Sequence, residues 1–397
     1  MKATLFEMID IGTAYTKVLV VEMLPRLNIL GSAIVPTQGM VRGEILDLTA
    51  LKECVHRAIN EAEKNAGFSN VRYAVMSVSG YEQVLGKQIV GITSTKSKSV
   101  SLEDMKSARA DASAHHAEEG FSIVQRVRQR YSIVQNDVET FTKTPQGKLS
   151  NSLKFFLWMI QGSKSYLGEM VQIANQYNLR VTELFAASLA SAEATKLGSY
   201  YDKNRLVIDI GAGTTDFAYF DDEGTLGFTG VLPVGGMNIN RDITFGMHVK
   251  NENAEKLKKE HASAIPSVED IGVEIALLPD RTFNRYILNT IVNVRVKELF
   301  ETVRDALPPR IKISNIVITG GSAKLKDIAV VAQDAFQGYG ANVLISEPKL
   351  NGIDEGFKDP IYSTVIGLAA LLENQYLTRH GNVEKKSLWQ QIKAIFN

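Results

Sequence analysis

Two segments about half a chain apart repeat one pattern, in which a strand, an acidic glycine-containing turn and a second strand follow one another. The first turn reads DIGT (residues 10–13) and the second reads DIGAGTTD (residues 209–216). Each pattern predicts a β-hairpin, because strand-like apolar runs flank a short turn. A hairpin repeated at this separation predicts a duplicated lobe, with a cleft between the two copies.

A third glycine turn and a change of pattern complete the organisation of the chain. ITGGSAKL (residues 318–325) follows a buried-strand signal and is predicted to open a helix. Residues 86–162 interrupt the lobes with a predicted helix at 101–119 and predicted strands at 121–134 and 154–161. We interpret this region as a small inserted α/β subdomain.

The composition limits the classes of partner. The 44 Lys and Arg residues balance 44 Asp and Glu residues, so no basic surplus predicts nucleic-acid binding. The single cysteine, Cys54, excludes an internal disulfide and a thiolate metal cluster, and it fits the reducing cytoplasm. No apolar run approaches the roughly 18 residues that a membrane span needs. We therefore expect any membrane contact to lie on the surface of the protein.

The acidic glycine turns suit the phosphates of a nucleotide. Glycine allows the backbone to approach an anion closely and to adopt positive φ, so that successive N–H groups point at it. Thr13 and Thr214 add hydroxyl donors, Lys17 adds a positive charge, and the carboxylates of Asp10 and Asp209 can hold Mg²⁺ through water. An ordinary turn explains each motif taken alone, but three motifs in this order favour a nucleotide site.

The last thirteen residues, KKSLWQQIKAIFN (385–397), follow a linker at 378–384 and predict an amphipathic helix. Such a helix is typical of a segment that lies in the plane of a membrane surface. The alternative is a short terminal helix that folds back onto the body of the protein. The predicted apolar stripe consists of Leu388, Trp389, Ile392, Ile395 and Phe396, and Lys385, Lys386 and Lys393 are predicted to face anionic lipid.

The three turns in this order resemble the ATPase core shared by actin, heat-shock chaperones and sugar kinases. Within that group, VLPVGGMNINRDI (231–243), AEKLKKEHA (from Ala254), PIYSTVIGLAALL (360–372) and the C-terminal segment resemble the FtsA family of bacterial cell-division proteins. The resemblance covers the chain from end to end. One loop departs from the family, because TPQGKLS (from Thr144) stands where an Asn-Pro-x-Gly-Met-x-Gly loop is usual.

The resemblance implies an α/β fold of two actin-like lobes with an inserted small α/β subdomain and a C-terminal amphipathic helix. The implied divisions are a first lobe at 1–85 and 163–204, the insert at 86–162, a second lobe at 205–377, the linker at 378–384 and the membrane-targeting helix at 385–397.

It also implies ATP and Mg²⁺ as ligands and assigns residues to them. Phosphate contacts fall on Gly12, Thr13, Ala14, Tyr15 and Lys17, and on Gly211, Gly213, Thr214 and Thr215. Adenosine contacts fall on Gly235, Gly236, Glu255, Lys258, Arg295, Glu298, Gly320, Gly321 and Ser322. Lys17 and Glu183 are the catalytic candidates, with Glu183 placed at a helix start to orient the attacking water. A helix N-terminal carboxylate stabilised by the helix dipole explains Glu183 equally well.

The implied function is an ATP-binding protein that polymerises and ties the division protein FtsZ to the inner membrane. The resemblance places it on the cytoplasmic face of that membrane at the division site, with at most slow ATPase turnover and with further division proteins as partners. The FtsZ C-terminal tail is predicted to dock on the second lobe near Arg285, although a solvated surface arginine is an equal explanation.

Three other functions fit the same core. A small-molecule kinase needs a general base, and no Asp occurs between Leu179 and Leu197 to provide one. A chaperone needs a peptide-binding domain, which nothing after Leu372 predicts. A pilus-assembly adaptor shares the core and the insert, but it has no reason to carry the amphipathic C-terminal segment. That segment favours the division scaffold.

Overall fold

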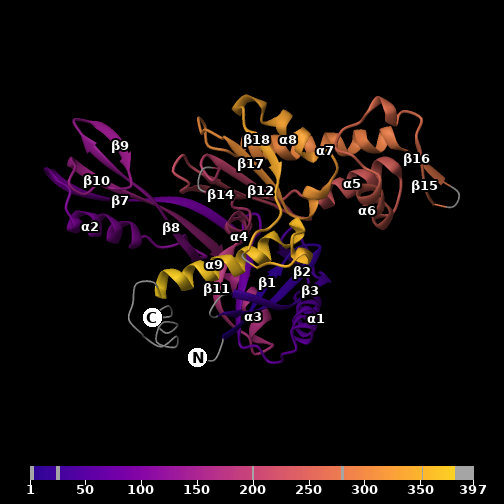
Figure 1. The fold of residues 1–397 in the computed structure, drawn as a ribbon, viewed down its shortest axis with the longest axis horizontal. Helices are drawn as coiled ribbons and strands as arrows, with labels where there is room; N and C mark the ends of the chain where they lie inside the picture. Colours follow the sequence, from indigo (N-terminus) through magenta and orange to yellow (C-terminus); the bar gives the residue numbers. More distant parts are fainter. Residues whose placement is uncertain (1–3, 24–26, 199–200, 279–280, 351, 381–397) are drawn as a thin grey trace.

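A computed structural model describes residues 4–23, 27–198, 201–278, 281–350 and 352–380, which form two lobes and an elongated insert (Figure 1). The predicted amphipathic helix (385–397) lies outside the described residues, as does the linker from 381 onward. Residues 378–380, predicted to begin that linker, instead continue the last helix. No helix among the described residues is long and apolar enough to cross a membrane.

The sheet of the first lobe has the strand order β11-β6-β1-β2-β3. The β1–β2 and β2–β3 pairs are antiparallel, whereas β6 and β11 extend the sheet in parallel. Side chains of β1 alternate between the two faces, as the period of two requires. The strands are β1 (Thr4–Ile11), β2 (Tyr15–Met23), β3 (Leu27–Pro36), β6 (Tyr73–Val78) and β11 (Arg180–Ala186).

The sheet of the second lobe repeats the first strand for strand. Its order is β14-β13-β12-β17-β18, with two antiparallel pairs followed by two parallel ones. The predicted hairpins and the predicted duplication are therefore both present, and the repeat extends over five strands. The central strands β12 and β17 are buried throughout, as parallel strands covered on both faces are. The strands are β12 (Arg205–Ile210), β13 (Thr215–Phe220), β14 (Leu226–Leu232), β17 (Asn315–Thr319) and β18 (Asn342–Ile345).

Helices cover both faces of the first sheet. On one face lie α1 (Leu48–Ala66) and α3 (Lys164–Asn175), and on the other lie α4 (Ala187–Ala194) and α9 (Ser363–His380). The Asp47 side chain caps α1 by accepting bonds from two backbone N–H groups. Although α9 follows the second lobe in sequence, Val365, Ile366 and Leu368 pack against the first sheet. The prediction that the second lobe extends to residue 377 is therefore wrong, because α9 packs with the first lobe.

The helices of the second lobe share one large apolar core. They are α5 (Gly236–Met247), α6 (Asn251–Glu260), α7 (Arg285–Asp305) and α8 (Ile328–Ala335), with a small hairpin of β15 (Glu274–Leu278) and β16 (Arg281–Asn284). The third glycine turn was predicted to open a helix, but it does not do so directly. A short 3-10 turn at Gly321–Lys324 follows it, and α8 begins only at Ile328.

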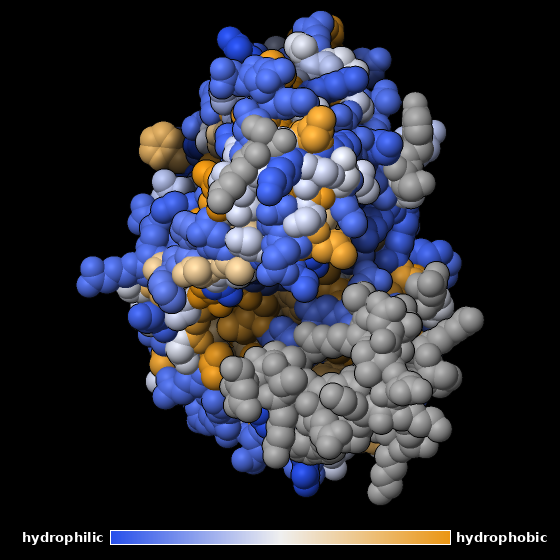
Figure 2. All heavy atoms as spheres, turned by 90° about the vertical axis from the view of Figure 1, so that its left-hand side faces the viewer, coloured by the Kyte–Doolittle hydropathy of each residue, from blue (hydrophilic) through white to orange (hydrophobic). Residues whose placement is uncertain are grey.

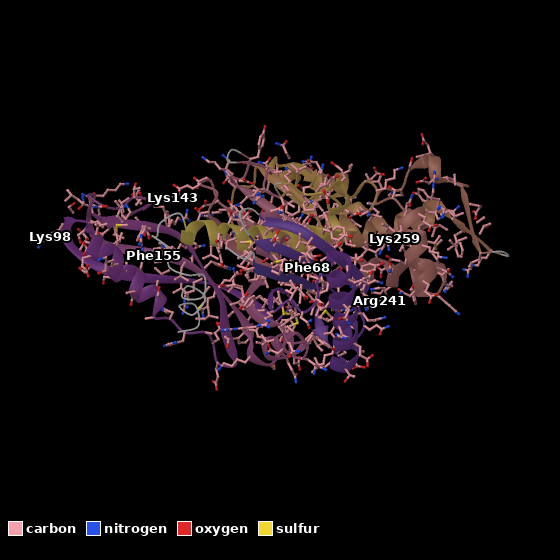
Figure 3. The ribbon with its side chains drawn as sticks, turned by 60° about the horizontal axis from the view of Figure 1, so that its bottom comes forward. Phe68, Lys98, Lys143, Phe155, Arg241 and Lys259 are labelled. Carbon is pink, nitrogen blue, oxygen red and sulfur yellow. The ribbon has the colours of Figure 1, made fainter. Side chains whose placement is uncertain are left out.

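The insert is an antiparallel sheet of order β7-β10-β8-β9 with α2 packed against it. Its elements are β7 (Val84–Ser99), α2 (Leu102–Ser113), β8 (Phe121–Gln135), β9 (Val138–Thr142) and β10 (Leu149–Ser163). The helix is shorter than predicted, and two of the four strands were not predicted. Figure 3 shows Lys98, Lys143 and Phe155 in this insert, far from Arg241 and Lys259 in the second lobe. Seen from the end where the insert lies, the surface is mostly hydrophilic, with apolar atoms gathered in a hollow (Figure 2).

Candidate nucleotide site

The two duplicated hairpins have the same turn geometry. The Gly12 N–H donates to the Tyr15 carbonyl at 3.1 Å, and the Gly211 N–H donates to the Thr214 carbonyl at 2.9 Å. Each turn therefore has a two-residue tip, at 13–14 and at 212–213. The tips meet across the lobes, since a Cβ on Gly213 would lie 2.4 Å from Thr13 Oγ1. Gly12, Gly211 and Gly213 do not adopt the positive φ predicted from sequence, so their small size is what the turns require.

Equivalent positions of the two hairpins carry different charges. Asp10 faces Lys17 across β1 and β2, and their side chains form an ion pair at 2.6 Å. Asp209 occupies the equivalent place in β12, and there it faces Asp216 on β13. The second lobe therefore has a carboxylate where the first has an ammonium group. Asp10 also accepts a bond from Ser77 Oγ at 2.7 Å.

The carboxylates of the second hairpin are buried and share unbalanced negative charge. Burial, with the nearby Asp10 charge, raises the pKa of Asp209 to about 6, although a bond from Thr364 partly opposes this. Burial and the charge of Asp209 raise the pKa of Asp216 to about 7. Ser79, in the first lobe, donates from Oγ to both Asp216 oxygens, at 2.7 and 2.8 Å. A cation at this place would relieve the repulsion.

Asp216 is a site residue that the sequence prediction omitted. Its signal was available, because Asp216 follows Asp209 by the same seven residues that separate Lys17 from Asp10. Ser79 had no comparable signal. It lies after β6 and meets Asp216 only because the two lobes pack together.

The predicted adenosine residues of three separate segments meet behind the second hairpin. The Gly211 carbonyl accepts bonds from the Gly236 N–H and from Ser322 Oγ, both at 3.0 Å. Lys258 Nζ donates to the Gly236 carbonyl at 3.3 Å and pairs with Glu255 at 2.6 Å. Gly320 has a φ of 88°, and a Cβ there would lie 2.2 Å from Asp209 Oδ1, so the position requires glycine.

The ionic contacts of this group fix its side chains. Burial would raise the pKa of Glu255, but the charge and hydrogen bonds of Lys258, with bonds from Lys259 and Asn240, hold it well below its usual range. Gly235 precedes α5, and its N–H bonds to Asn238. Arg295 on α7 pairs with Asp242 of α5 and with Glu298. Arg295 therefore ties α7 to the helix that Gly236 begins, and Glu298 lies beside Arg295.

The environments of two predicted residues differ from those expected from the sequence. Glu183 does not begin a helix, which corrects its assignment as a helix-start residue. It lies inside β11, beside an irregularity in the pairing with β6, and α4 begins at Ala187. Arg285 is the first residue of α7, and it pairs with the buried carboxylate of Asp270 at 2.6 Å. It is half-exposed and already has a partner.

The donor set around the hairpins fits a hydrated magnesium ion. Carboxylate oxygens are the protein ligands that Mg²⁺ prefers, and it keeps several waters when few of them bind it. Among the described residues no three ligating side chains form a ready cage. Asp209 and Asp216 nevertheless face each other across β12 and β13, and the nearby charge of Asp10 acts on both. A hollow over α3, lined by residues such as Leu167, Val171 and Gln172, includes none of the residues predicted to bind nucleotide.

These features together define the actin-like ATPase fold. They are the two sheets of identical order, the paired acidic hairpins and the insert that follows β6. Solved structures agree. The PilM–PilN type IV pilus biogenesis complex matches with a TM-score of 0.60 and 18% identity over 92% of this chain and 98% of that chain. MreB 5 of Spiroplasma citri, bound to AMPPNP, matches with a TM-score of 0.56 and 13% identity over 96% and 100%. At these identities the likeness shows the fold alone.

Sequence comparison finds similarity to one family within this class. The profile of the family described as cell division protein FtsA matches residues 206–367. Cell division protein FtsA of Bacillus subtilis is 29% identical over 97% of this chain and 86% of its own length. The FtsA protein of Escherichia coli K12 is 27% identical over 95% and 92%. The predicted resemblance is confirmed, because the chain is similar to FtsA cell-division proteins over nearly its whole length.

Proposed function

We propose that this protein binds ATP with Mg²⁺ where its two lobes meet, and that it acts as a polymerising scaffold in cell division. The observation that carries the proposal is the group of buried carboxylates, Asp10, Asp209 and Asp216, at the duplicated hairpins. Mg²⁺ bound there would relieve the repulsion between the Asp209 and Asp216 carboxylates and neutralise the charge of nucleotide phosphates. Lys17, held by Asp10, would supply a fixed positive charge beside them.

Titration with ATP and Mg²⁺ tests this site. Asp209→Ala removes a charge-assisted contact worth roughly 1.5–3 kcal/mol, so we expect affinity to fall about ten- to a hundredfold. Asp222→Ala, in an exposed turn of the same sheet, is the matched control and should leave affinity unchanged. Equal affinities for the parent and Asp209→Ala would overturn the proposed site.

We also propose that turnover is slow and that ATP chiefly holds the lobes in a polymerising shape. All of α4 is described, and its first turn has no acidic residue to orient an attacking water. A measured turnover within the range of about 1–100 per second that kinases show would favour the kinase alternative instead. The pilus-adaptor alternative has only the likeness of fold in its favour.

The proposed partners are the FtsZ tail, other copies of this chain, anionic lipid and further division proteins. Around Arg285, the apolar side chains of Val268, Ile271 and Ile287 are exposed by 81%, 62% and 51%. Exposed apolar residues beside a basic one suit a peptide with both apolar and acidic groups. The C-terminal segment 385–397 would lie in the membrane surface, on the cytoplasmic face at the division site.

A further inference from the structure

A small hairpin of the first lobe touches both phosphate turns. It consists of β4 (Met40–Val41) and β5 (Glu44–Ile45), with Arg42 and Gly43 at its tip. The Gly43 N–H donates to Thr13 Oγ1 at 3.2 Å. A Cβ on Gly43 would lie 3.1 Å from Thr214 Cγ2, and a Cβ on Gly213 would lie 2.8 Å from Arg42 Cα. The tip therefore contacts a turn residue of each lobe.

The backbone of this tip is held in an unfavourable conformation. Arg42 has a φ of 52° and Gly43 has a φ of 79°. Glycine adopts such angles without cost, but the left-handed region is unfavourable for a residue with a long side chain. Asparagine or glycine would fit the Arg42 position better. An arginine at a strained position beside a phosphate turn indicates a functional role for its side chain.

The position of the tip beside the second hairpin indicates which end of a bound nucleotide would lie near Arg42. Gly211, at the start of the turn, is bonded to Gly236 and Ser322, which belong to the proposed adenosine group. Gly213 and Thr214, at the far side of the turn, are the residues that meet Arg42 and Gly43. Arg42 thus lies at the end of the phosphate turn that is remote from the adenosine group, where a terminal phosphate would lie.

The charges around the site also leave Arg42 available. Lys17, the basic residue of the first hairpin, is already paired with Asp10. Arg42 is half-buried and, within the part of the chain that the structure describes, no hydrogen bond or ion pair engages its guanidinium group. A guanidinium group offers several donors in the planar geometry that binds phosphate oxygens in pairs.

We propose that Arg42 binds the terminal phosphate of the nucleoside triphosphate and so distinguishes a triphosphate from a diphosphate. The inference rests on the proposed nucleotide site and adds a residue to it. Its consequence is that the β4–β5 tip, which bonds Thr13 in the first lobe and meets Thr214 in the second, is placed to respond to loss of that phosphate.

Affinities for a non-hydrolysable ATP analogue and for ADP, each with Mg²⁺, test this proposal. Arg42→Asn and Arg42→Gly remove the guanidinium group and fit the left-handed backbone, so neither variant should lose stability. We expect both to bind the ATP analogue about tenfold more weakly and ADP within about threefold of the parent. Arg42→Lys should keep part of the preference for the triphosphate, because it keeps the charge but not the planar fork.

The control is Arg57→Asn, which removes a positive charge from the exposed face of α1 in the same lobe and should change neither affinity. Equal losses for the ATP analogue and ADP in the Arg42 variants, or no loss, would overturn the assignment of Arg42 alone. A parent protein that binds neither nucleotide would instead overturn the proposed function.

Discussion

Glu7 is a buried acid outside the proposed site. It lies on β1 with no solvent exposure, and neither carboxylate oxygen has a hydrogen-bond partner among the described residues. Burial, and to a lesser degree the charge of Glu63, raise the pKa of Glu7 to about 8. At neutral pH its carboxyl group is therefore mostly protonated, because an unpaired charge in this apolar layer would be costly.

This pKa predicts a pH dependence of stability. Between the unfolded value of 4.5 and the folded value of about 8, the folded protein binds more protons at Glu7 than the unfolded chain does. Its contribution to stability is complete below pH 4.5 and is lost as pH rises to 8, by at most about 1.4 kcal/mol per unit. Glu7→Gln should remove this loss, so its melting temperature should gain on the parent between pH 5.5 and 8. The control Glu22→Gln, half-buried in β2, should follow the parent. Parallel curves for parent and Glu7→Gln would contradict the assignment.

At the scale of elements, the insert is tied to the second lobe as well as to the first. Gln129 on β8 donates to the Leu226 and Gly227 carbonyls at 2.9 and 2.7 Å. Trp158 on β10 donates from Nε1 to Thr229 Oγ1 at 3.0 Å. All three acceptors lie on β14, which pairs with β13. The first residues of β13 belong to the proposed site. Strand β13 therefore joins the nucleotide site to the insert.

This connection predicts that the insert responds to the nucleotide. Trp158→Phe combined with Gln129→Ala keeps the aromatic ring but removes three hydrogen bonds of about 1 kcal/mol each. We expect ATP affinity to stay within about threefold of the parent, whereas ATP-dependent sedimentation of the polymer should be largely lost. Lys87→Ala, which breaks an exposed ion pair inside the insert, is the control. Normal ATP-dependent sedimentation of the double variant would contradict the coupling.

At the scale of the whole molecule, the proposed function requires three separate regions to act together. The proposed nucleotide site lies where the lobes meet, and the proposed FtsZ surface around Arg285 lies on the second lobe. The predicted amphipathic segment, 385–397, follows α9 in the sequence. One amphipathic helix binds a membrane weakly and reversibly. Copies held side by side in a polymer would raise the effective concentration of each helix, and they can strengthen binding about a hundredfold or more. Membrane binding should therefore depend on polymerisation.

Sedimentation with anionic vesicles and FtsZ separates two of these regions. Trp389→Glu with Ile392→Glu places charge on the apolar stripe, so vesicle binding should fall about tenfold or more. Ile287→Glu changes the proposed FtsZ surface without breaking the Arg285–Asp270 pair, so it should still bind vesicles but no longer bring FtsZ down with them. Each variant controls for the other. Parent-like vesicle binding by the first variant would refute the membrane segment, and parent-like FtsZ recruitment by the second would refute the docking surface.

Local patterns determined much of this protein. Apolar strands around acidic glycine turns specify the two hairpins, because turn chemistry and a period of two act between neighbouring residues. The same turns pointed to Asp10, Lys17 and Asp209, and their order pointed to the fold. Other local segments, such as 231–243 and 360–372, carried the resemblance to FtsA proteins. The spacing of Asp209 and Asp216 equals that of Asp10 and Lys17. It was a further local signal of a site residue at Asp216.

Only the tertiary structure decided the rest. It brought Ser79 against Asp216 and placed the Arg42 tip on a turn of each lobe. It put Glu183 inside a strand and packed α9 against the first lobe rather than the second. Each of these depends on residues far apart in the chain that meet when the sheets and helices pack. A period of two or 3.6 residues records which face of an element is buried, but it does not record which distant element covers that face.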